Sequence, residues 1–103
     1  MKLYCFGESG HSYKAALALQ LAKIDWDPIF VDFFNGEARS EQYRSQINEM
    51  GEVPVFVDGD TKLTQSGVIQ AYLYNKTGKH GGSNKTEELE VLRWVLWLSL
   101  IHI

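Results

Sequence analysis

Cysteine and proline are scarce in this 103-residue chain. The single cysteine, Cys5, excludes an internal disulfide and any Cys-x-x-Cys redox motif. It lies in an apolar run, which favours a buried and unreactive thiol over a reactive one. Pro54, one of two prolines, stands in a run of β-branched and aromatic residues, so it belongs at the start of a strand or at a sheet edge.

Excess positive charge and a membrane-length apolar segment are missing as well. The formal net charge is −3 and the ten Lys and Arg residues are scattered, which gives no support for nucleic-acid binding. A bilayer span needs about twenty apolar residues, and the apolar run at the N-terminus is too short for a signal peptide. His11, His80 and His102 have no metal-site spacing. We therefore expect a cytoplasmic protein with no metal, no nucleic-acid partner and no membrane partner.

The first part of the chain predicts a βαβ unit. Residues 2–6 read as a buried strand, residues 12–23 as a helix and residues 29–34 as a second strand. This order predicts a right-handed crossover between parallel strands. The helix is expected to bury one stripe, which comprises Tyr13, Ala16, Leu17, Gln20, Leu21 and Ile24.

The middle of the chain predicts a short helix, a hairpin and a longer helix. Residues 53–57 and 62–64 read as hairpin strands around an Asp58-Gly59 turn. Ser40 precedes the short helix, and a helix over 66–76 ends before Gly78. The order βα-β-α-ββ-α predicts an α/β fold with a mixed sheet, the thioredoxin-like architecture.

The last segment predicts a linker and the start of a second, all-helical domain. We expect domains at residues 1–78 and 86–103, joined by a linker over 79–85. Thr86 opens the final helix, which is apolar on nearly every side from Trp94 onward. Such a helix must be covered. We expect the chain to be truncated, so that the residues that pack against this helix belong to a missing domain or to another subunit. Alternatively, the helix folds back onto the sheet domain.

Two stretches carry features of a binding site. If the Val53-Pro54 bond is cis, the backbone N–H and C=O of Val53 are free to pair with an extended ligand, although most X–Pro bonds are trans. Gln65-Ser66 precedes an apolar run, and a helix start presents unpaired N–H groups that suit a carboxylate. The alternative is that Ser66 only caps the helix.

Three motifs follow one another along the chain: Ser9-Gly10-His11-Ser12-Tyr13-Lys14, Asn48-Glu49-Met50-Gly51-Glu52-Val53-Pro54 and Gln65-Ser66. In this order and spacing they resemble the N-terminal, glutathione-binding domain of cytosolic glutathione transferases, in particular the serine-type, zeta-like and bacterial ones. The resemblance covers about residues 2–78, and residues 87–97 look like the first helix of the family's second domain. It implies a homodimeric transferase that uses glutathione and a small electrophile of unknown identity.

The resemblance also implies residue roles. Val53, ahead of a cis Pro54, pairs its backbone with the cysteinyl part of glutathione, and Gln65 and Ser66 hold the γ-glutamyl carboxylate. Ser9 takes the position of the catalytic serine, whose hydroxyl donates to the glutathione sulfur and favours the nucleophilic thiolate. The alternative is that Ser9 only caps the first helix.

The sequence departs from the family pattern at several positions. Glu52 stands where many members carry Lys or Gln, and its carboxylate would repel the glycine carboxylate of glutathione. Ala38 replaces a histidine that some members use for that end, so Arg39 is the best local substitute. His11 occupies a cysteine position and either lines the electrophile pocket or is exposed. The residues from Leu98 to Ile103 do not resemble the family's continuation.

Two other functions stay open. Glu52 and Ala38 favour a non-catalytic glutathione-transferase-like module that serves binding or assembly. A glutaredoxin-like thiol oxidoreductase shares the architecture but needs a cysteine at the start of the first helix, and residues 9–12 contain none.

Overall fold

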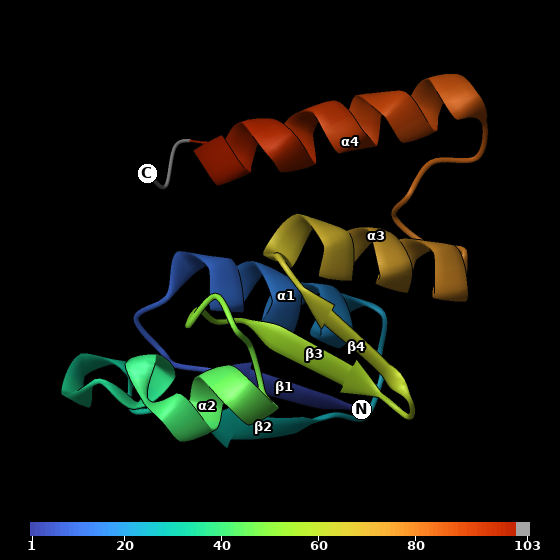
Figure 1. Ribbon diagram of the computed structural model, residues 1–103. Helices are drawn as coiled ribbons and strands as arrows, with labels where there is room; N and C mark the ends of the chain where they lie inside the picture. Colours follow the sequence, from blue (N-terminus) through green and yellow to red (C-terminus); the bar gives the residue numbers. More distant parts are fainter. Residues whose placement is uncertain (101–103) are drawn as a thin grey trace.

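The computed structural model describes residues 1–100 and contains one four-stranded sheet in the order β2-β1-β3-β4 (Figure 1). Strand β1 pairs in parallel with β2 and antiparallel with β3, which pairs antiparallel with β4. The elements are β1 (Lys2–Cys5), α1 (Gly10–Leu21), β2 (Asp27–Phe30), the 3-10 turns η1 (Phe33–Asn35) and η2 (Glu37–Arg39), α2 (Glu41–Gln46), β3 (Val55–Asp58), β4 (Thr61–Thr64), α3 (Ser66–Thr77) and α4 (Lys85–Leu100). The predicted element order and mixed sheet are confirmed.

Helices α1 and α3 cover one face of the sheet and α2 lies at the other (Figure 1). Leu3 and Phe56 stand opposite each other in the β1–β3 ladder, are fully buried, and belong to the cluster that includes residues of α1 and α3. Tyr4 points the other way because side chains alternate along a strand, and it packs against the second cluster around Tyr43 of α2. Each face of the sheet therefore has its own apolar layer.

Helix α1 corrects the predicted buried stripe. The exposed fractions of Tyr13, Leu17 and Leu21 are 63%, 40% and 54%, whereas the helix buries the face that includes Ala15, Ala18 and Leu19. Alanines fit here because α1 packs closely against α3 as well as the sheet. The helix also begins two residues earlier than predicted, at Gly10, since Ser9 is its N-cap.

Two strands are displaced from their predicted positions. Strand β2 begins at Asp27 rather than at residue 29 and includes Pro28, which the outer edge of the sheet tolerates because only one side of the strand forms a ladder. In the hairpin, Asp58 pairs with Thr61. The turn is therefore Gly59-Asp60 instead of Asp58-Gly59, and Gly59 supplies the positive φ, +60°.

Helix α4 lies along α3, as Figure 1 shows, so part of it does fold back onto the sheet domain. A Cβ added at Gly67 of α3 would lie 3.1 Å from Val95 Cγ1, which shows how closely the two helices approach. Five other apolar side chains of α4 have exposed fractions of 44–67%: Leu89, Leu92, Trp94, Leu96 and Trp97. Of the terminal residues predicted to differ from the family, 101–103 lie outside the described part.

None of the helices in residues 1–100 combines the length and apolar character needed to cross a bilayer. The same residues contain no group of three or more His, Cys, Asp and Glu side chains placed to hold a metal ion. His102, the last of the three histidines, falls outside the described range.

Candidate functional site

The loop before β3 is held by the side chain of Asn48, which is buried. Its Nδ2 donates to the Glu52 carbonyl oxygen at 3.0 Å, and its Oδ1 accepts from the Met50 N–H at 3.0 Å. Gly51 has a φ of +68°, and a Cβ there would lie 2.9 Å from the Ala38 carbonyl oxygen, so only glycine fits. This loop delivers the Val53-Pro54 bond, which is cis, to the start of β3.

Tyr43 of α2 provides a second anchor for the same loop. Its hydroxyl donates to the Glu52 carbonyl oxygen at 2.8 Å. Burial raises the pKa of Tyr43 to about 12, so the hydroxyl stays protonated and remains a donor at neutral pH. Sequence reasoning assigned no role to Asn48 or Tyr43, although Asn48 begins the motif that ends at Pro54.

A cleft opens between this loop and the starts of α1 and α3. It brings together Val53, Pro54, Gln65 and Ser66, which the resemblance marks for glutathione binding, with Glu52, which departs from the family pattern. We call it the cis-proline cleft; its lining is completed by His11 and Asn48. Val53 lies outside the β1–β3 ladder, which begins at the Tyr4–Val55 pair. Its backbone N–H and C=O are therefore not paired in this ladder.

The start of α3 differs from the prediction in one respect. Ser66 is the first helical residue and not the N-cap; the cap position is occupied by Gln65, whose side chain makes no capping hydrogen bond. Gln65 has a φ of +72°, a conformation that costs a non-glycine residue about 1–3 kcal/mol and often occurs at functional sites. The first N–H groups of α3 therefore lack a side-chain acceptor from the cap, next to the cis-proline cleft.

His11 joins α1 to α3 across the cleft. Its Nδ1 lies 3.3 Å from Oγ of Ser66, and the imidazole is half-buried. The expectation of an exposed first-turn histidine is therefore wrong. One signal for this placement is present in the sequence, because His11 follows Ser9 and Gly10 within the first motif, but only the fold sets His11 against Ser66.

Ser9 lies at the N-cap of α1, two residues before His11. Its Oγ accepts a hydrogen bond from the Ser12 N–H at 3.0 Å, and its own N–H donates to the Phe6 carbonyl oxygen at 3.2 Å. Ser9 therefore caps the helix, as the alternative interpretation predicted. A serine oxygen that accepts one hydrogen bond still has an O–H to donate, so capping and a role toward a ligand are compatible.

Arg39 and Ala38 lie apart from this cleft. Arg39 is exposed at the end of η2 and borders a separate depression with Glu41, Arg44, Ser45 and Glu49. Ala38 is buried in the layer beneath α2. Cys5 is half-buried in β1, where burial raises the pKa of its thiol, in keeping with an unreactive cysteine.

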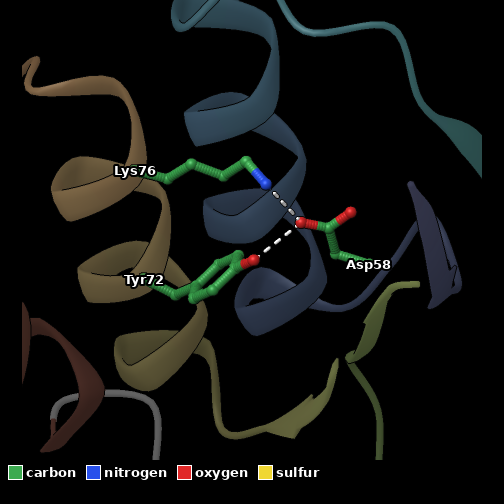
Figure 2. A network of polar contacts seen from close by, with 3 residues as sticks. All are labelled: Asp58, Tyr72 and Lys76. Atoms are coloured by element: carbon green, nitrogen blue, oxygen red, sulfur yellow. Dashed lines mark hydrogen bonds and ion pairs between the residues drawn. The ribbon is translucent and has the colours of Figure 1, made fainter. Parts of the chain in front are cut away.

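A further polar network connects the hairpin with α3 outside the cleft (Figure 2). Asp58 Oδ2 accepts from the Tyr72 hydroxyl at 2.6 Å and from Lys76 Nζ at 2.8 Å. These hydrogen bonds, that of Lys76 first, lower the pKa of Asp58 below its ordinary value. None of the three residues lines the cis-proline cleft, so we interpret the network as structural.

Together, a βαβ unit, a ββα unit and a cis-proline that borders a cleft define a thioredoxin-like domain, here followed by a further helix. The family model "Glutathione S-transferase, N-terminal domain" matches residues 1–75, and the chain belongs to this family.

Individual relatives are in line with this assignment. The chain is 40% identical over 73 residues to glutathione S-transferase F14 of Arabidopsis thaliana, covering 71% of this chain and 28% of that protein. It is 32% identical over 80 residues to a zeta class glutathione S-transferase of Euphorbia esula, covering 78% of this chain and 35% of the relative. A glutathione transferase homologue from Sulfitobacter, solved with bound glutathione, superposes with a TM-score of 0.84 at 27% identity, over 95% of this chain and 48% of that one. The chain thus spans about a third of these curated relatives.

Proposed function

We propose that this chain is the glutathione-binding part of a glutathione transferase, which binds glutathione and stabilises its thiolate for attack on an electrophile. The observation that carries this proposal is the cis-proline cleft, which gathers four residues that the resemblance marks for glutathione: Val53, Pro54, Gln65 and Ser66. Ser9 stands at the start of the helix that supplies His11 to the same cleft. The relatives span far more chain than this one, so the transferase activity belongs to the proposal for the whole protein.

The start of α3 is suited to the γ-glutamyl carboxylate. Its uncapped N–H groups and the positive end of the helix dipole attract an anion. Ser66 adds a hydroxyl at the first helical position, and Gln65 adds a side-chain amide. Val53 offers backbone groups to the cysteinyl part of the ligand, in the manner of a strand added at a sheet edge.

Ser9 is proposed to act on the glutathione sulfur. Its Oγ already accepts the Ser12 N–H, which leaves the hydroxyl proton available for the sulfur. Donation to a thiolate is a charge-assisted hydrogen bond, so it lowers the thiol pKa and increases the fraction of nucleophile at neutral pH. The thiol proton passes to solvent. The thiolate then forms a carbon–sulfur bond, while a π bond of the attacked carbon, or its bond to a leaving group, breaks and takes the electron pair away from that carbon.

The surroundings of Ser9 offer an apolar surface for the unknown electrophile. Phe6 stacks on Phe33 with ring centroids 4.8 Å apart, and Phe34 meets Phe6 edge-on at 5.5 Å. Phe34 is 71% exposed, so the cluster has an open side. The Phe6 carbonyl oxygen accepts from the Ser9 N–H at 3.2 Å, so the chain leads from this cluster directly to Ser9, and we propose the cluster as the surface that receives the electrophile.

The proposal is tested by following thiolate absorbance of bound glutathione against pH. We expect a bound-thiol pKa about one unit below the ordinary thiol value near 8.5, and loss of that shift in Ser9→Ala. Ser45→Ala, which removes an exposed hydroxyl of α2, is the control and should leave the shift intact. An unshifted pKa in the parent chain would contradict thiolate stabilisation.

A non-catalytic binding or assembly module is the second candidate. The observation that favours it is Glu52, whose exposed side chain brings a carboxylate to the rim of the cleft. Arg39, the proposed counterpart for the glycine end of glutathione, borders a different depression. If the parent chain binds glutathione without a shift in the thiol pKa, that result would favour this candidate.

Homodimer formation and cytoplasmic location remain predictions from the resemblance and the sequence.

A further inference from the structure

We infer that His11 is a positioning residue for the proposed glutathione site, which sets the direction of the Ser66 hydroxyl and makes carboxylate binding depend on a proton. The inference rests on the proposed function. Its starting point is the 3.3 Å contact between His11 Nδ1 and Ser66 Oγ within the cis-proline cleft. Ser66 is only 5% exposed, and this contact is the hydrogen bond that its hydroxyl makes in the described chain.

The hydroxyl of Ser66 carries one proton, and the state of His11 decides where that proton points. If Nδ1 is unprotonated, the imidazole accepts and the Ser66 O–H is directed at His11. A ligand carboxylate would then meet the lone pairs of Oγ. If Nδ1 carries a proton, it donates to Oγ, and the Ser66 O–H is free to donate to the carboxylate. Binding of the anion therefore selects the form with a proton on Nδ1.

The imidazolium form has an advantage over the neutral Nδ1–H tautomer. It adds positive charge close to the uncapped start of α3, where the helix dipole already favours an anion. Carboxylate binding should therefore draw a proton from solvent onto His11. Since imidazoles titrate near neutral pH, this proton uptake can be measured without exposing the protein to extreme pH.

Other charged groups also lie near His11. Glu52 lines the cleft from the loop before β3 and carries an acidic side chain. Lys14 follows one turn later on α1; its Nζ donates to Ser99 Oγ of α4 at 3.4 Å, and burial lowers its pKa below the ordinary value. Because His11→Gln keeps both of these groups, the variant separates their effect from that of His11. Helix α3 carries no charged residue before Lys76, in its last turn.

The experiment measures the dissociation constant of S-methylglutathione between pH 5.5 and 7.5 by calorimetry. This ligand has no thiol, so the role of Ser9 does not enter. We expect binding to the parent chain to be about five- to tenfold tighter at pH 5.5 than at pH 7.5. In His11→Gln, which keeps an N–H donor but does not titrate, the dependence should be lost. His80→Gln, at an exposed histidine of the loop before α4, should retain it.

Equal pH dependence in His11→Gln and the parent would overturn the inference and leave the proposed function intact. Failure of the parent to bind S-methylglutathione at any pH would overturn both. A measurement on the unmodified chain guards against a variant that does not fold: the His11 ring resonances should report a raised pKa when S-methylglutathione is added. An unchanged His11 titration would also overturn the inference.

Discussion

Asn48 illustrates how one buried side chain contributes to the site by holding its backbone in place. Its amide joins both ends of the turn over residues 48–52, through the Met50 N–H and the Glu52 carbonyl. This turn sets the position of Val53, which has no partner in the β1–β3 ladder to hold it. A residue of this kind acts on binding through the backbone that it supports.

Replacement of Asn48 by alanine tests this role. The variant leaves the Met50 N–H without its partner and the Glu52 carbonyl with Tyr43 alone, so the free energy of unfolding should fall by about 1–3 kcal/mol. Glutathione affinity should fall with it, because Val53 is then less well placed. Urea unfolding and calorimetry measure the two effects. Asn35→Ala, which removes hydrogen bonds to Asp32 at an exposed site, should change stability by less than about 0.5 kcal/mol; equal losses in both variants would contradict the role of Asn48.

The hairpin and helix α3 are connected at two places, and the two connections have different roles. At one end of α3, Gln65 and Ser66 border the cis-proline cleft. In its last turns, Tyr72 and Lys76 bind Asp58 at the end of β3 (Figure 2). The strained conformation at Gln65 is thus tolerated in a segment that is anchored further along by the Asp58 network.

The Asp58 network should make stability depend on pH in the acid range. Its hydrogen bonds lower the pKa of Asp58 in the folded state, so they stabilise the fold above the ordinary carboxyl value, 3.8, and this contribution disappears as pH falls through the folded-state pKa. The difference in unfolding free energy between the parent and Asp58→Asn should be constant from pH 7 to about pH 4 and shrink below it. Urea titrations between pH 2 and 7 provide the measurement.

Asp60→Asn is the matched control, because Asp60 lies in the same hairpin turn and makes no side-chain hydrogen bond within residues 1–100. Its unfolding profile should follow that of the parent at every pH. A parent-to-Asp58→Asn difference that persists unchanged to pH 2 would show that the network does not depend on ionised Asp58.

Helix α4 contacts the sheet domain over a small area that includes a buried charge. Val95 approaches Gly67 of α3, and one turn later Ser99 Oγ accepts from Lys14 Nζ of α1 at 3.4 Å. Lys14 is only 7% exposed and has no ion-pair partner within residues 1–100. Burial accordingly lowers the pKa of Lys14 below its ordinary value.

Lys14→Met should therefore stabilise this chain, by about 1–2 kcal/mol near neutral pH. The sign follows from the lowered pKa: the folded state binds the proton less tightly than the unfolded state, so the charged form is penalised on folding until the pH rises above the folded-state pKa. Lys79→Met, at an exposed lysine between α3 and α4, is the control and should change little. Urea unfolding at pH 7 decides, and a loss of stability specific to Lys14→Met would contradict the prediction.

Features that depend on neighbouring residues could be predicted from the sequence alone. The turn glycine at position 59, the glycine that ends α3 and the alternating strands of the hairpin were identified within one or two residues, because backbone preferences and side-chain periodicity are local properties. The motifs that line the cis-proline cleft were identified through the resemblance to glutathione transferases, which each of them carries as a short run of consecutive residues.

Which helix faces are buried and which distant side chains meet depends on how the elements pack in three dimensions. Helix α1 has apolar residues all round, so its pattern did not reveal that Ala15 and Ala18 would face the core while Leu17 stayed exposed; the close approach of α3 selected the small residues. The contact between His11 and Ser66 joins residues that are 55 positions apart, which no local pattern encodes. The packing of α1 against α3 creates that contact, and with it the proposed proton dependence of binding.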